Sequence, residues 1–122
     1  MKVVICEPNK NARIAVIGNE LENIQKVVGG YIEAVYPFED EVAIVCNDEG
    51  KFNGCEPCRA LYDDDGNMYD IVFGTFFICD CSGENFDSLS DEMANKYKEM
   101  FDKAETYYRG SRGIQAIKYD AF

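Results

Sequence analysis

The chain has 122 residues, a net charge of −11 and a hydrophobic content of 47%, which suits a single folded domain, 1–122. The acidic charge excludes a basic nucleic-acid-binding face and disfavours adsorption to anionic membranes, so we expect no DNA partner and no membrane partner. The sequence has neither an apolar run of about 20 residues, as a membrane span requires, nor a signal-peptide pattern, so we expect a cytoplasmic location.

Short apolar strands alternate with turns along the first half of the chain. Residues 2–6 and 12–17 have the composition of strands. Asn19 and Glu22 have the spacing of a capping box before a short helix, and Gly29-Gly30 supplies its stop. Further strands or extended segments are predicted at residues 31–36, 41–46 and 59–62.

The second half predicts one long strand and one long helix. Residues 68–79 (MYDIVFGTFFIC) are rich in β-branched and aromatic residues, which favours a central strand with a bulge or close backbone approach at Gly74. Ser88 or Ser90 would cap a helix whose apolar stripe runs from Met93 to Tyr108. With a final short strand at 114–117, the predicted fold class is α+β. It comprises an antiparallel-rich β-sheet, one short helix and one long C-terminal amphipathic helix.

Six cysteines raise the question of a metal or a redox site. The spacings Cys55-x-x-Cys58 and Cys79-x-Cys81 are compatible with a structural zinc site, but the second spacing is poor and the chain contains no histidine. Reduced thiols are the better interpretation in a chain without a secretion signal. We expect no metal and no cofactor.

Five residues are candidates for binding a ligand. Arg109 and Arg112 lie between glycines and could hold phosphate, or could simply suit the C-terminus of a helix. Phe86, in a polar loop, could staple the following helix or stack on a base. Asn95 lies one residue off the apolar stripe, where its amide could read an adenine edge or remain structural. Arg59 is one of only four arginines.

Five segments carry a resemblance over most of the chain. It resembles a domain family of unknown function that is common in phages and mobile elements of Gram-positive bacteria, and the first type of Thoeris anti-defence proteins, the phage sponges. The segments are Gly29–Glu33 (GGYIE), Tyr36–Phe38 (YPF), Arg59–Leu61 (RAL), Tyr69–Ile71 (YDI) and Gly74–Ile78 (GTFFI).

The resemblance implies a binding protein and not an enzyme. Such sponges bind cyclic ADP-ribose isomers in the host cytoplasm without cleaving them. They form dimers, some combined into hexamers that also hold cyclic oligonucleotides. It further implies that Phe86 and Asn95 contribute to an ADP-ribose pocket, and that Arg59 and either Arg109 or Arg112 contact anionic ligands.

Two other function classes remain open from the sequence. The negative charge also fits an acidic protein–protein inhibitor, a DNA mimic of the anti-restriction or anti-CRISPR kind. An enzyme that cleaves a cyclic nucleotide is disfavoured because histidine, the commonest general base, is absent.

Overall fold

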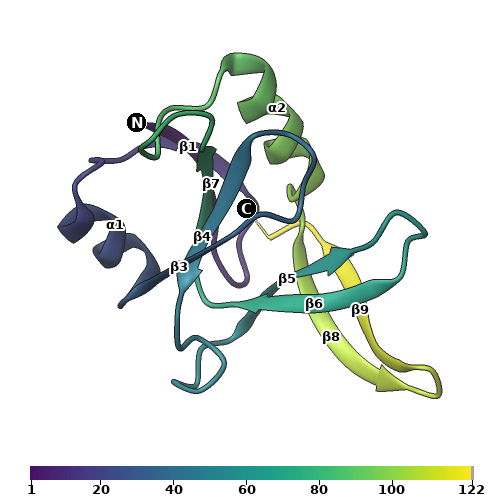
Figure 1. Cartoon of the computed structure of the whole chain (residues 1–122). Helices are drawn as coiled ribbons and strands as arrows, with labels where there is room; N and C mark the ends of the chain where they lie inside the picture. Colours follow the sequence, from purple (N-terminus) through teal and green to yellow (C-terminus); the bar gives the residue numbers. More distant parts are fainter. Residues whose placement is uncertain (122) are drawn as a thin grey trace.

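A five-stranded antiparallel sheet forms the centre of the molecule. Figure 1 shows the computed structural model, which describes residues 1–121. The strands follow the spatial order β2-β1-β7-β4-β3, so that β7 is central and β2 and β3 are the edges. Their bounds are β1 (Lys2–Cys6), β2 (Arg13–Val16), β3 (Ile32–Val35), β4 (Val42–Asn47) and β7 (Phe76–Asp80).

Each face of this sheet packs against its own helix, because successive side chains of a strand point to opposite faces. On one face, Ala43 and Val45 of β4 cluster with residues of α1 (Leu21–Val28). On the other face, Val42 and Ile44 cluster with residues of α2 (Asp91–Met100). The central strands are therefore buried on both sides, which explains their nearly continuous apolar sequence.

Two β-hairpins extend the structure beyond the sheet, on the side of α2. The first pairs β5 (Pro57–Tyr62) with β6 (Met68–Phe73), and the second pairs β8 (Ala104–Gly110) with β9 (Gly113–Tyr119). Strands β5 and β8 lie against one another, and the tip of the β8–β9 hairpin projects away from the sheet (Figure 1).

The predicted long C-terminal helix is wrong. Helix α2 ends at Met100, and the chain from Ala104 onward forms the β8–β9 hairpin, so the fold is mostly β with two short helices. The apolar spacing that suggested a helix continues through Tyr107 and Tyr108, but both are aromatic strand formers. A tight turn closed by Gly113, with φ of 100°, lets this segment pair with its own continuation.

The single strand predicted at 68–79 is also wrong. Gly74 adopts a φ of 79° and separates β6 from β7, which belong to different sheets. A glycine permits this left-handed conformation at little cost, so the chain leaves the hairpin and enters the central sheet there.

The helix ends are confirmed in part. Gly29 ends α1 in the left-handed conformation, and the Ser90 hydroxyl accepts a hydrogen bond from the Met93 amide at the start of α2. Asn19 does not cap α1, because Glu20 occupies the N-cap position and makes no side-chain cap. Neither helix of the described residues is both long and apolar enough to span a membrane.

Candidate functional site

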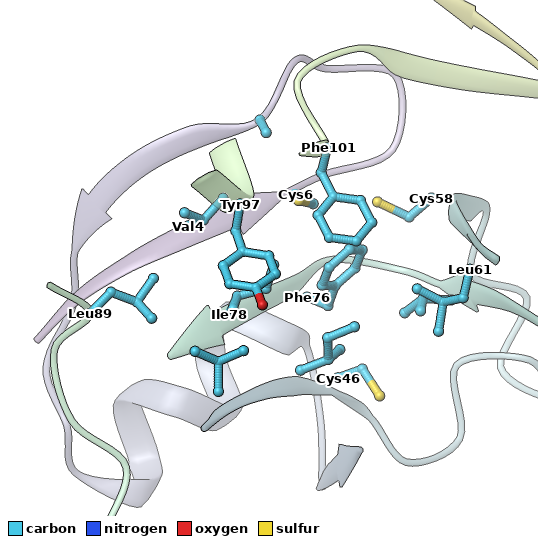
Figure 2. Close-up of a cluster of buried hydrophobic side chains, with 14 of the residues drawn as sticks. Val4, Cys6, Cys46, Cys58, Leu61, Phe76, Ile78, Leu89, Tyr97 and Phe101 are labelled. Atoms are coloured by element: carbon cyan, nitrogen blue, oxygen red, sulfur yellow. The ribbon is translucent and has the colours of Figure 1, made fainter. Parts of the chain in front are cut away.

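A cleft of about 650 Å³ opens where the two hairpins meet α2 and the loop before β4. This volume lies within the range of about 300–1,000 Å³ that is usual for small-ligand sites. The cluster of buried side chains behind it, which includes Tyr97, Phe101 and Leu61, is shown in Figure 2. Because these residues come from α2 and β5, the cleft sits on a packed and rigid base.

One rim of the cleft carries a carboxylate that accepts hydrogen bonds from two side chains. Asp40 accepts a hydrogen bond of 2.7 Å from the Tyr97 hydroxyl and one of 2.5 Å from the Lys96 ammonium. Both hydrogen bonds lower the pKa of Asp40, and the one from Lys96 has the larger effect. Burial and the bond to Asp40 raise the pKa of Tyr97, so this tyrosine keeps its proton and continues to donate. The rim is therefore fixed in charge and in orientation.

The floor of the cleft carries a second, buried carboxylate. Glu105 of β8 is only 6% exposed, and its Oε1 accepts from the Ala60 amide at 2.9 Å and from the Tyr107 hydroxyl at 2.8 Å. Burial, and then the hydrogen bond to Glu105, raise the pKa of Tyr107, so its hydroxyl remains a donor. These two bonds hold Glu105 in one position.

The second oxygen of Glu105, Oε2, has no hydrogen-bond donor among residues 1–121. Yet no fully buried side-chain oxygen or nitrogen in this part of the chain lacks a partner. Glu105 also lines the cleft. It follows that Oε2 borders the open space of the cleft.

The walls of the cleft combine apolar and aromatic side chains with charged ones. Tyr62 and Tyr69, both partly exposed, stand on the β5–β6 hairpin, and Met100 stands at the end of α2. The charged groups of the lining are four carboxylates and two ammonium groups: Glu39, Asp40, Asp64, Glu105, Lys96 and Lys118. A ligand with a flat apolar body and hydrogen-bond donors at its deep end would complement this surface.

Arg59 lies beneath the cleft and is fully buried. Its guanidinium donates to the backbone carbonyls of Lys10 at 2.7 Å, Cys58 at 2.9 Å and Phe101 at 3.0 Å. Phe101 is the C-cap of α2, where the helix dipole favours a cation. Arg59 is therefore inaccessible in the folded chain, and its guanidinium connects three segments of the backbone.

The other four predicted ligand residues do not gather around the cleft. Phe86 is half-buried against the hydrophobic cluster on the α1 face, whereas Asn95 is exposed on α2. Arg109 and Arg112 are exposed at the tip of the β8–β9 hairpin. A single chain therefore does not bring Phe86, Asn95 and these arginines into one pocket.

Sequence reasoning missed Glu105. It is one of 23 acidic residues, and it lay inside a segment that was assigned to a helix. Only its place on β8, opposite the Ala60 amide of β5, distinguishes it from solvated carboxylates.

The cysteines are all free thiols, and four of them are buried. Burial raises the pKa of Cys46 to about 11 and those of Cys58 and Cys79 to about 12, which leaves few reactive thiolates. Within residues 1–121 no group of three or more cysteine, aspartate or glutamate side chains is arranged to hold a metal ion.

Comparison with known proteins gives one match. The family model described as "Domain of unknown function (DUF3846)" matches residues 1–102, from β1 through α2. No curated protein and no solved structure shows significant similarity to the chain. The β8–β9 hairpin lies beyond the matched residues.

Proposed function

The chain belongs to the DUF3846 family, and we propose that it is a non-catalytic binding protein that sequesters a small nucleotide signal in the cleft. The proposed ligands are cyclic ADP-ribose isomers and cyclic oligonucleotides, the class implied by the resemblance to phage sponges. The observation that carries the proposal is the 650 Å³ cleft, with aromatic walls and fixed carboxylates at its rim and floor.

The aromatic walls support a ligand that contains a base. Stacking of a base on an aromatic side chain contributes about 1–3 kcal/mol, and both Tyr62 and Tyr69 are available for it. The charges constrain the orientation of the ligand, since Glu105 at the floor would repel a phosphate. Phosphates would therefore lie toward Lys118 and Lys96, with the base directed inward.

Binding without cleavage is favoured by the residues at the site. The cleft contains no histidine, because the chain has none, and the rim carboxylate Asp40 is occupied by Lys96 and Tyr97. Cys58 of β5, the strand that lines the cleft, has a raised pKa and so lacks the thiolate that a nucleophile requires.

Nanomolar capture requires about −12 kcal/mol, more than one stacked base and one hydrogen bond supply. We therefore include a second subunit in the proposal, which would add contacts around an open cleft. Phe86, Asn95, Arg109 and Arg112 are exposed or half-buried, so a partner subunit could use them. The proposed assembly is a homodimer, or a hexamer built from such dimers.

The test is calorimetric titration of the purified protein with cyclic ADP-ribose isomers and cyclic oligonucleotides, followed by heating and chromatography of the released ligand. Tight binding with intact ligand supports sequestration, whereas altered ligand would mean that the protein is an enzyme. Tyr69→Ala should weaken binding about tenfold or more through lost stacking. Phe86→Ala and Asn95→Ala report on the intersubunit site.

Failure to bind any of these molecules would remove the proposal. The acidic protein–protein inhibitor would then be the remaining reading, supported by the exposed run Asp63–Asp65 at the tip of the β5–β6 hairpin. An inhibitor of this kind would bind a protein partner with an affinity that falls as the salt concentration rises.

A further inference from the structure

Glu105 combines two properties that rarely occur together in a purely structural side chain. It is more than nine-tenths buried, and one of its carboxylate oxygens has no donor among the described residues. Because no fully buried side-chain oxygen or nitrogen of residues 1–121 lacks a partner, this oxygen keeps access to the cleft, where water or a ligand can donate to it. The other oxygen is held by two strands at once, through Ala60 of β5 and Tyr107 of β8 itself. The free oxygen is thus pre-positioned at the floor of the cleft.

A carboxylate at this position selects for the chemistry of its partner. Ionised Glu105 can only accept hydrogen bonds, and it repels phosphates and carboxylates. Its partner must therefore present a donor. The walls that lead to it, formed by Tyr62, Tyr69 and Met100, favour a planar group over a flexible alkyl amine. An amino group on an aromatic base meets both requirements.

We propose that Glu105 is the specificity residue of the cleft, accepting at Oε2 a hydrogen bond from the exocyclic amino group of an adenine-type base. This inference rests on the proposed function, because it assumes that a nucleotide occupies the cleft. The base end of the ligand is then recognised at the floor of the cleft. There the amino group, and not the phosphate, decides which ligands bind. Lys118 and Lys96, which also line the cleft, would remain for the phosphate end.

The variant Glu105→Gln separates recognition from folding. A glutamine keeps one oxygen that can accept from the Ala60 amide and the Tyr107 hydroxyl, so that its amide NH₂ must face the cleft in place of Oε2. The hydrogen bonds within the protein persist, while the acceptor offered to the ligand becomes a donor. The matched control is Asp65→Asn, which removes one charge at an exposed position that does not line the cleft.

The experiment is a protein-observed NMR titration with two probes, adenosine 5′-monophosphate and purine riboside 5′-monophosphate. The second probe lacks only the amino group. We expect the wild type to prefer the adenosine probe by about tenfold or more, as is usual for a hydrogen bond to a charged group. Glu105→Gln should bring the ratio of the two affinities close to one, and Asp65→Asn should leave it as in the wild type.

The outcomes distinguish this inference from the proposed function. Equal affinity of the wild type for both probes, with shifts at Tyr69 and Met100, would overturn the role of Glu105 while leaving nucleotide binding in place. A preference that persists in Glu105→Gln would overturn it as well. The absence of shifts at the cleft with either probe would overturn both proposals.

Discussion

Replacing Arg59 by methionine removes the guanidinium that connects three parts of the chain. Its donors bind the carbonyls of Lys10 in the β1–β2 loop, Cys58 in β5 and Phe101 at the end of α2. Methionine fills much of the same space without any donor, so the variant Arg59→Met tests the hydrogen bonds more than the packing.

The expected loss follows from these contacts. Each buried carbonyl left without a donor costs about 1–3 kcal/mol. The carbonyls of Cys58 and Phe101 are buried, whereas that of Lys10 is only partly buried and can recruit water, so we expect a loss of about 4 kcal/mol. With a urea dependence of about 2 kcal/mol per molar, the midpoint of unfolding should fall by roughly 2 M.

Urea unfolding followed by circular dichroism measures this change. Arg13→Met is the matched control, since Arg13 is exposed and its ion pair with Glu7 should contribute less than about 1 kcal/mol. If the midpoints of Arg59→Met and Arg13→Met agree within error, Arg59 does not stabilise the fold in the manner described. A ligand-binding role for this arginine would then be open again.

Three further predictions concern the thiols and one turn. Burial raises the pKa of Cys58 and Cys79 to about 12 from an ordinary value of 9.0, so above pH 9 the unfolded chain releases protons that the folded chain keeps. The free energy of unfolding should therefore fall as pH rises through this range, which urea midpoints at about pH 8 and about pH 10.5 would show. Iodoacetamide should label the half-buried Cys55 and Cys81 in the native protein and all six cysteines after unfolding, as counted by mass spectrometry. Gly74→Ala should destabilise the protein by about 1–2 kcal/mol because its φ is 79°, and thermal unfolding would measure the loss.

Each of these predictions has its own control. Cys58→Ala should reduce the slope of stability against pH, and an unchanged slope would contradict the assignment to buried thiols. Gly66→Ala shares the positive φ but meets no neighbour, whereas a Cβ at Gly74 would lie 3.3 Å from Cys55. If Gly66→Ala lost more stability than Gly74→Ala, the close contact with Cys55 would not explain the cost at Gly74. Labelling of more than two cysteines in the native state would indicate a looser core.

The central sheet could be predicted from the sequence, whereas the site could not. Apolar runs such as residues 2–6 and 41–46 become β1 and β4 because burial on both faces requires apolar side chains at every position. Gly29 is likewise a local feature, since a left-handed stop depends on that residue alone.

The errors occurred where long-range contacts decide the structure. The spacing of Met93, Ala94 and Tyr97 correctly indicated α2, but the same spacing continues by coincidence into β8. Directly after the helix, the Phe101 carbonyl accepts a hydrogen bond from Arg59, which is 42 residues away in sequence, and no local spacing reveals such a contact. The cleft was missed for the same reason. Glu105 reaches the floor of the cleft only because its segment is a strand and not a helix.

The hairpin that supplies Glu105 lies outside the residues matched by the family model, while most of the remaining cleft lies inside them. Neither of the two hydrophobic core clusters of the described residues contains a residue of β8 or β9. Under the proposed function, exposed positions of this hairpin can therefore be varied to alter one side of the cleft while the core of the central sheet is kept, as loops on a constant framework are varied in antibodies.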